Sequence, residues 1–487
     1  MDMDRKISVI AAAILLVADN VGTGILALPG QAAALGGRAV GIALIIAFAP
    51  LCWYAGVALH RAATLIERHN AERMLSSDAG GAEPSLINDL FGLAAALYGN
   101  QSFVARFTAF LFYTTLFLQM ASYLVVLSQT LQKIIHLPGG AAFCRPWAGL
   151  ATAMLLLFSN QFSTMAAVAR GPAGISVLGV VAVVIICVIY AARDDAAPTT
   201  SPPPPHEPES LVENALDRAA ATGGVIFAEG VTMLLLNSRQ ALADPSRVGT
   251  ALGLALSGMC VGFTVVVMCS GEHPLPFLLD AIPHSAPTYR HLAASLLFVH
   301  VAISYAISSV ALCSAILRLP LMQREDARRQ HTSSTIKPVS SGCSGGHRES
   351  GGEAGAGVGA PIGDDSDPVN STIAAPLSCC WQQLEWALLT SFVMLMAWLL
   401  ANAAPFFAAL IDLIGSLNLC TFFLPSLFLR RAHELTRTPL PLWERALTAA
   451  LMLASVGMTA AGITGSIYGI VRSWRHYGPP FACHAGL

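Results

Sequence analysis

Glu229 has the most direct chemical consequence, because it places a carboxylic acid inside an otherwise uncharged stretch of sequence, TGGVIFAEG at residues 222–230. An ionisable group in the middle of a membrane is costly to bury and is therefore expected to serve a function. An apolar cavity penalises the charged form of a carboxyl group, and such a group can bind a proton on one side of a membrane and release it on the other. We predict that Glu229 carries a coupled proton, with Asp19 as a second candidate.

Two glycine-containing segments are expected to interrupt membrane helices. Residues 20–29 have the sequence NVGTGILALP, and Gly230 follows Glu229 in the second segment. Glycine weakens a helix by about 1 kcal/mol and proline weakens it more, and backbone groups freed inside lipid must line a cavity or contact a ligand. Two such breaks in corresponding halves are typical of an inverted-repeat secondary transporter. The residues assigned to substrate binding are Asn20, Val21, Gly22, Thr23, Gly24, Ile25, Phe227, Ala228, Gly230 and Tyr305.

Alternative interpretations of these polar and glycine residues stay open at this point. The pair Gly22 and Gly24 would also suit close packing between helices. Asp412 follows Pro405 closely, so it is expected either near the outer interface in contact with water or in a functional role. His300 is a candidate proton carrier, although a single histidine on a membrane helix more often forms hydrogen bonds within the packed bundle.

The composition requires a membrane around these residues. Of the 487 residues 55% are apolar and 11% are charged, against about 25% charged in soluble proteins, and the mean hydropathy is +0.62. The net charge of −2 provides no basic field that would attract nucleic acid. No Cys/His metal spacing, GxSxG or phosphate-binding loop occurs, so we expect neither an enzyme nor a resident cofactor or metal.

Apolar runs predict an all-α polytopic protein with about eleven transmembrane helices in the lipid bilayer. They cover residues 7–35, 40–63, 103–135, 147–159, 173–192, 219–236, 248–270, 290–319, 384–404, 406–429 and 447–471. The loops with most Lys and Arg fall on the side of the N-terminus, which places that terminus in the cytoplasm and the C-terminus outside. Both glycosylation sequons, at Asn100 and Asn370, then lie in the cytoplasm and should carry no glycan.

The connections between the spans divide the chain into one transporter domain, residues 1–472, with three polar segments. Residues 193–216 form a Pro-rich acidic loop outside, and residues 473–487 form a short tail on the same side. Residues 323–377 are rich in Gly, Ser and charge, so this cytoplasmic loop is expected to be disordered, with any binding partner unknown.

Three groups of cysteines fit this topology. Most cysteines lie inside apolar runs and behave as small hydrophobic residues. Cys144 and Cys483 both fall outside, so a disulfide between them is allowed. Cys379 and Cys380 lie where the 323–377 loop enters the membrane, a setting compatible with palmitoylation.

Three sequence strings together resemble the amino acid/auxin permease family, and especially its proton-assisted amino acid transporter branch. They are NVGTGILALP, IFAEG followed by ADP, and PFFAALIDLIGSLN with a later FFLP. The resemblance implies a leucine-transporter-like fold of five-plus-five inverted repeats with discontinuous helices 1 and 6, an extra C-terminal helix, and transport of amino acids. Residues 233–240 lack the Pro and the acidic residue that members commonly carry there, which leaves the substrate class open.

An amino acid has a carboxylate and an ammonium group, and both must be satisfied inside the membrane. The N–H groups of Thr23, Gly24 and Ile25 would suit the carboxylate if the first helix breaks before them. Carbonyl groups of Phe227 and Ala228, with Glu229, would suit the ammonium group or a proton.

The function predicted from these residues is secondary active transport of amino acids by alternating access, coupled to protons. Sodium coupling is the first alternative, with Ser304, Ser308 and Ser309 supplying hydroxyl ligands beside carbonyls of the first helix. An amino-acid-sensing receptor that signals without net transport is the second. We expect a multi-pass protein of the plasma membrane or of a vacuolar or lysosomal membrane.

Overall fold

The computed structural model describes residues 6–76, 87–135, 144–160, 168–169, 171–192, 210–270, 277–283, 285–317, 374–403, 407–477 and 481. These residues form helices and no β-strand longer than an isolated bridge. The helices of the first half are α1 (Val9–Ala34), α2 (Arg38–Ser76), α3 (Leu90–Tyr98), α4 (Phe103–Ile134), α5 (Arg145–Ser159) and α7 (Pro172–Ala191). Those of the second half are α8 (Leu211–Glu229), α9 (Thr232–Ala241), η2 (Pro245–Arg247), α10 (Val248–Cys269), η3 (Leu278–Ala281), α11 (Pro287–Leu317), α13 (Ala374–Ala403), α14 (Phe407–Ser416), η4 (Leu419–Phe423), α15 (Leu424–Leu435) and α16 (Leu442–Tyr477).

Ten helical units in the described residues are long and apolar enough to cross a membrane, which confirms the polytopic all-α fold. The one predicted span not among them is the fourth, residues 147–159, which corresponds to α5. This helix has 15 residues, and at a rise of about 1.5 Å per residue it is shorter than a ~30 Å hydrocarbon core. The inverted-repeat relation between the two halves stays a prediction.

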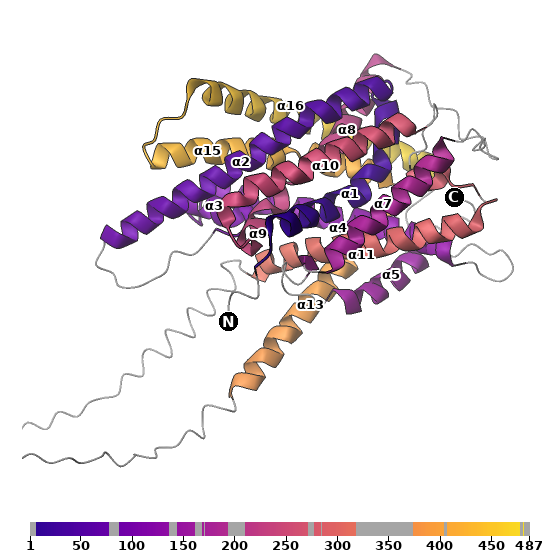
Figure 1. Cartoon of the computed structure of the whole chain (residues 1–487), viewed down its shortest axis with the longest axis horizontal. Helices are drawn as coiled ribbons and strands as arrows, with labels where there is room; N and C mark the ends of the chain where they lie inside the picture. Colours follow the sequence, from indigo (N-terminus) through magenta and orange to yellow (C-terminus); the bar gives the residue numbers. More distant parts are fainter. Residues whose placement is uncertain are drawn as a thin grey trace, which may run out of the picture.

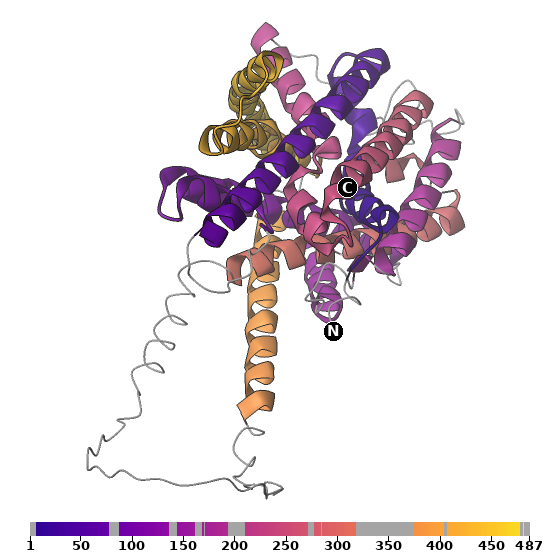
Figure 2. The same cartoon turned by 60° about the vertical axis from the view of Figure 1, so that its left-hand side comes forward.

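The bundle has an inner set of helices surrounded by an outer set. Most residues of α1, α4, α11 and the α8–α9 unit are buried, whereas fewer than a third of those in the apolar stretches of α7, α13 and α16 are. Figure 1 places α1 in the middle of the bundle, and Figures 1 and 2 both show α13 extending away from the other helices. The outer helices carry exposed large apolar residues, as expected of surfaces that face lipid.

The first helix differs from its prediction, because α1 continues without a break from Val9 to Ala34 and includes Pro29. Its glycines are used for packing instead. A Cβ atom at Gly24 would lie 2.9 Å from Cα of Ala228, so α1 and α8 approach too closely for any side chain there. A glycine that replaces a larger residue at a helix contact shortens the interhelical distance without unwinding the helix.

The sixth span is interrupted as predicted. α8 ends at Glu229, Gly230 has φ −77° and ψ 56°, and α9 starts at Thr232. A second interruption occurs in the tenth span, where α14 ends at Ser416 and a π-helical segment, Leu419–Phe423, precedes α15. The side chain of Asn418 at this second break accepts hydrogen bonds from Ser455 and Thr459 of α16. The two interrupted helices are therefore the sixth and the tenth rather than the first and the sixth.

The predicted loop limits shift by a few residues where helices continue. Ser210 accepts a hydrogen bond from the Glu213 N–H and caps α8, so residues 211–216 of the predicted 193–216 loop are helical. Likewise α13 starts at Ala374, inside the predicted 323–377 loop, and α16 extends to Tyr477, inside the predicted tail. The Trp474 indole donates to the carbonyl of Ala403 and holds this last turn of α16 against the end of α13. Residues 193–209, 318–373 and 482–487 lie outside the described residues.

The cysteines include one of the two that were predicted to form a disulfide. Cys144 is disulfide-bonded; Cys483, its predicted partner, lies outside the described residues. The side chains of Cys379 and Cys380 also lie outside them. Six cysteines are free in the described part of the chain, namely Cys52, Cys187, Cys260, Cys269, Cys313 and Cys420.

Candidate functional site

Glu229 is the last residue of α8, next to the break at Gly230. Its side chain is 1% exposed, and neither carboxylate oxygen has a hydrogen-bond partner among the described residues. An ionised carboxylate buried without a partner costs several kcal/mol. Such a carboxyl group is less costly to bury when it holds a proton or meets a cationic group; the proton-coupling role of Glu229 stays a prediction.

The two segments predicted to bind substrate lie side by side. The close approach of Gly24 and Ala228 brings residues 20–25 of α1 beside residues 227–230 of α8 and the turn that follows. The position of a Cβ at Gly230 would lie 3.8 Å from the hydroxyl of Thr421 in the other interrupted span. The predicted segments are thus brought together by helix packing, with α1 unbroken. The N–H groups of Thr23, Gly24 and Ile25 consequently belong to a continuous helix and are not the exposed helix end that the sequence predicts.

Three hydroxyl groups on these elements are buried without partners in the described structure. Two of them are Thr23 of α1 and Thr232 at the start of α9, and the third is Tyr305 on a further helix, α11; all three side chains are fully buried. Buried polar groups in native proteins are nearly always hydrogen-bonded, so an unpartnered group calls for an explanation such as a ligand or water. Thr232 was missed by sequence reasoning, although its place directly after the predicted break was a usable signal.

Asp19, the second predicted proton-coupling residue, has a different environment from Glu229. Its carboxylate accepts hydrogen bonds from Ser308 Oγ at 3.0 Å and from Gln119 Nε2 at 3.3 Å. The Tyr123 hydroxyl donates to the Asp19 carbonyl at 2.8 Å. Several donors can stabilise a buried carboxylate in its charged form. Gln119 and Tyr123 of α4 were not identified from the sequence, because nothing there shows that α4 faces Asp19.

Two of the three serines predicted for a sodium site meet α1. Ser304 Oγ donates to the Ala18 carbonyl at 2.7 Å, and Ser308 contacts Asp19 one turn further along α11. Ser309 lies instead near Cys313 of its own helix, with Oγ 3.8 Å from Sγ. The oxygens of Ala18, Asp19, Ser304 and Ser308 form a set of hard ligands, and Ser309 does not belong to it.

His300 packs against the first glycine of α1. Its Nδ1 lies 2.6 Å from Ser176 Oγ and 3.0 Å from the Ser176 carbonyl, which ties α11 to α7. The other ring nitrogen, Nε2, is buried without a partner in the described structure, and a Cβ at Gly22 would lie 2.2 Å from it. His300 therefore fills the space beside Gly22, as expected of a packed histidine. Its Nε2 atom remains without a hydrogen bond.

A polar pair on the other side of the bundle centre was only half predicted. Gln31 Nε2 donates to Asp412 Oδ1 at 2.7 Å and links α1 to α14. A Cβ at Gly224 would lie 2.7 Å from both Asp412 Oδ1 and Gln31 Cδ, so α8 completes the contact. Asp412 is thus held by Gln31 rather than simply solvated at an interface. Gln31 was missed because one glutamine at the end of an apolar run gives no signal by itself.

The end of α9 opposite to Gly230 is held by two sets of contacts. Arg239 forms a bidentate ion pair with Glu67 of α2, in which Nη1 and Oε1 are 2.8 Å apart. Glu67 Oε1 also accepts from the Ile87 N–H at 2.8 Å. Ile7 exchanges backbone hydrogen bonds with Ala241 and Ala243, of 2.8 and 3.0 Å. These contacts join α9 to α2 and to the segment that precedes α1.

The described residues contain no group of three or more His, Cys, Asp or Glu side chains that could hold a metal ion.

The profile of one protein family, described as "Transmembrane amino acid transporter protein", matches residues 5–472. No curated protein matches the sequence.

Solved structures of a manganese transporter from Eremococcus coleocola also match. One, in complex with an aromatic bis-isothiourea substituted compound, is 12% identical with a TM-score of 0.34, and a mutant of the same transporter is 14% identical with a TM-score of 0.35. Each alignment covers 95% of both chains. Likeness at this level carries no argument about what this chain transports.

Proposed function

Since the chain belongs to the transmembrane amino acid transporter protein family, we propose that it transports amino acids by secondary active transport and that protons drive this transport. Its place in the family is the proton-assisted branch, and the bundle works by alternating access, opening its central site to one side of the membrane at a time. The plasma membrane and a vacuolar or lysosomal membrane are the two locations consistent with this function.

The observation that carries the proton coupling is the environment of Glu229. This carboxyl group is buried, lies at a helix break and has no partner among the described side chains. When the site opens to water the group can ionise, and when the site closes it must bind a proton or a cation. The cycle links proton transfer to the closing of the site, which is what coupling requires.

The unpartnered hydroxyl groups support a substrate site between α1, α9 and α11. We assign the substrate carboxylate to the hydroxyls of Thr23, Thr232 and Tyr305, since the N–H groups of α1 are used within its helix. The ammonium group is assigned to Glu229 and to the Phe227 and Ala228 carbonyls near the break. A few polar groups in an apolar setting are typical of small-molecule sites.

Sodium coupling is the second candidate, and one observation favours it. Ser304 and Ser308 bring hydroxyl oxygens to the Ala18 carbonyl and the Asp19 carboxylate. Oxygen ligands of this kind suit a small hard cation. In the structure these oxygens already satisfy one another by hydrogen bonds, so a bound cation would have to replace those bonds.

The test is uptake into proteoliposomes that contain the purified full-length protein. A panel of labelled amino acids is offered under an imposed pH gradient and, separately, under an imposed sodium gradient. Accumulation of at least one amino acid under the pH gradient alone is the expected result. Accumulation only under the sodium gradient would show that sodium, and not the proton, is the coupling ion. Binding without accumulation under either gradient would show that the protein is a receptor and not a transporter.

A further inference from the structure

A cavity of about 340 Å³ lies where α15 ends and α16 begins, far along the sequence from the residues assigned to transport. Its lining includes Arg430, Arg437 and Arg445, together with His433, Glu434 and Thr438. Cavities of roughly 300 Å³ and above are large enough for small-molecule ligands. Three guanidinium groups around one cavity predict a ligand with strong negative charge.

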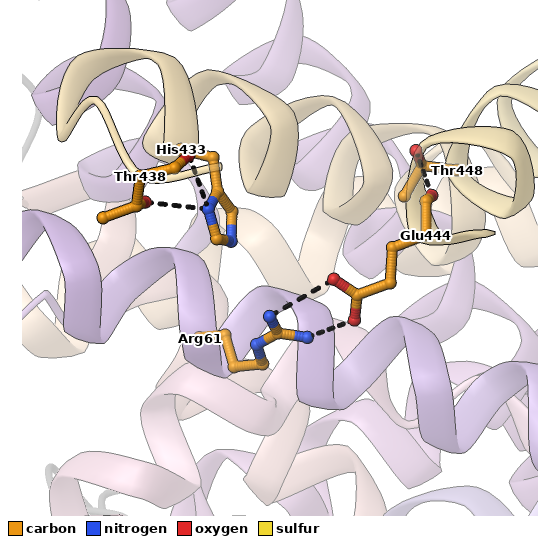
Figure 3. Close-up of polar contacts among 5 residues, drawn as sticks. All are labelled: Arg61, His433, Thr438, Glu444 and Thr448. Atoms are coloured by element: carbon orange, nitrogen blue, oxygen red, sulfur yellow. Dashed lines mark hydrogen bonds and ion pairs between the residues drawn. The ribbon is translucent and has the colours of Figure 1, made fainter. Parts of the chain in front are cut away.

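The acidic side chains next to this cavity are already paired. Glu434 accepts from Arg431 at 3.2 Å, and Arg431 also stacks on Tyr98. Glu444 forms a bidentate ion pair with Arg61 of α2, whose second contact is 3.3 Å long (Figure 3). In the described part of the chain, Arg430, Arg437 and Arg445 make no ion pair with an acidic residue. The cavity therefore has an uncompensated positive charge.

His433 lines the cavity and holds the turn that follows α15. Its Nδ1 lies 2.8 Å from the Thr438 hydroxyl, as Figure 3 shows. The other ring nitrogen, Nε2, is buried and has no hydrogen-bond partner in the described structure. Nδ1 also lies 3.3 Å from the Thr438 carbonyl, and the Thr438 hydroxyl lies 2.9 Å from that of Thr436, so His433 fixes the turn that borders the cavity.

The backbone holds Arg437 in a conformation that costs energy. Thr438 N–H donates to the His433 carbonyl and Arg437 N–H to the Glu434 carbonyl, the pair of bonds that ends a helix with a left-handed residue. That residue is usually glycine, but here it is Arg437, with φ of 54°. Strained residues of this kind persist only where the surrounding structure fixes them, and they cluster at ligand-binding and switch regions.

The surroundings of the cavity point to a lipid rather than to a soluble anion. Leu442 and Trp443, at the start of α16, are 81% and 62% exposed, and tryptophan is enriched at membrane interfaces. Further along α16, Leu453 and Val456 leave an exposed apolar surface for acyl chains. Through Arg61 and the nearby Glu67–Arg239 pair, the cavity lies on the arginine-rich side that the positive-inside rule assigns to the cytoplasm.

We propose that this cavity binds the phosphorylated headgroup of an anionic phospholipid from the cytoplasmic leaflet. Arg430, Arg437 and Arg445 contact the phosphate oxygens, and His433 holds the turn that carries Arg437. The acyl chains lie along α16. The bound lipid would connect α15, and through it the interrupted tenth span, to α16.

The test measures binding of dioctanoyl phosphatidylinositol 4-phosphate to the purified full-length protein in phosphatidylcholine nanodiscs. Replacing the three arginines together (Arg430→Gln, Arg437→Gln and Arg445→Gln) is expected to weaken binding on the order of a hundredfold, at about 1 kcal/mol for each arginine. The matched control replaces three exposed arginines from the same side that do not line the cavity: Arg68→Gln, Arg106→Gln and Arg247→Gln. It should retain binding within about twofold, and an equal loss in both triple variants would overturn the proposal in favour of general charge attraction.

A single substitution separates ligand binding from a structural role. Arg437→Gly removes one guanidinium and also relieves the left-handed backbone. The expected result is weaker lipid binding, by about fivefold, with a melting temperature that is unchanged or higher. Unchanged lipid binding by this variant, with a higher melting temperature, would mean that Arg437 has no part in a lipid site.

The source of the phosphate is decided by two further probes on the wild-type protein. Soluble inositol 1,4-bisphosphate and inorganic phosphate should bind far more weakly than the lipid, because they lack acyl chains for the exposed face of α16. Equal affinity for a soluble probe would show that the cavity binds a soluble phosphate compound and not a lipid. No binding of any of the three probes would overturn the site altogether.

Discussion

The imidazole ring of His300 lies directly against Gly22, so that a Cβ at residue 22 would be 2.2 Å from His300 Nε2. This contact joins α11 to α1 at the level of the predicted substrate segment. Atoms at this separation overlap, and His300 is further fixed by its hydrogen bond to Ser176 of α7. One glycine thus sets the relative position of three helices around the site.

The first prediction concerns this contact. Gly22→Ala should abolish uptake and lower the free energy of unfolding by about 1–3 kcal/mol, since the added methyl group displaces the ring. Adding His300→Ala to that variant should restore much of the thermal stability, because the space is then free. Gly258→Ala is the control, as nothing lies within 4 Å of its Cβ position. Full uptake by Gly22→Ala alone would show that the ring moves without consequence.

The second prediction concerns Gly24. Gly24→Val should remove transport without preventing membrane insertion, because the Cβ position already lies 2.9 Å from the Ala228 backbone. α1 and α8 would have to separate beside Glu229. Uptake and surface expression of the variant are measured together. Uptake at the wild-type rate would show that the contact between Gly24 and Ala228 is not needed for transport.

The third prediction tests Glu229. Glu229→Gln keeps the shape and hydrogen-bonding capacity of a protonated carboxyl group but cannot release a proton. The variant should still bind substrate and exchange it across the membrane, yet fail to concentrate it under a pH gradient, because a group that does not titrate provides no linkage. Concentrative uptake at the wild-type level would show that Glu229 is not the proton carrier. Asp19 would then be the remaining candidate.

The fourth prediction separates the two coupling ions. Under proton coupling, the double variant Ser304→Ala and Ser308→Ala should retain pH-driven accumulation, and a sodium gradient should drive none in wild type. Ser309→Ala is the matched control on the same helix, since Ser309 contacts Cys313 instead of α1. If wild type responds to sodium and only the double variant loses that response, the sodium alternative is the correct one.

The fifth prediction compares two glutamates of α2. Glu67→Gln leaves Arg239, which is 4% exposed, without its carboxylate, and breaking a buried pair of this kind costs about 3 kcal/mol. Glu72 pairs with Arg68 at the surface, so Glu72→Gln should change stability by less than about 1 kcal/mol. Thermal midpoints in detergent measure the difference, and similar midpoints for the two variants would contradict the role given to the Glu67–Arg239 pair.

Several features of this protein followed from the sequence alone. The apolar runs specified the membrane-spanning class, because only a helix satisfies its own backbone in lipid. They also gave nearly all of the spans, since length and hydropathy are local properties. The break at Gly230 and the isolated Glu229 were equally visible, because each is a departure from a uniform apolar stretch.

The tertiary structure decided what the local sequence left ambiguous. Gly22 and Gly24 permit either a helix break or a close contact, and the presence of His300 and Ala228 opposite them selects the contact. The second break falls near Asn418, whose side-chain oxygen accepts hydrogen bonds from the Ser455 and Thr459 hydroxyls of α16. The partners of Asp19 and Asp412 come from α4, α11 and the end of α1, and no spacing in the sequence indicates these contacts. A side chain's type is written in the sequence, but the group that it meets depends on how helices distant in the chain pack together.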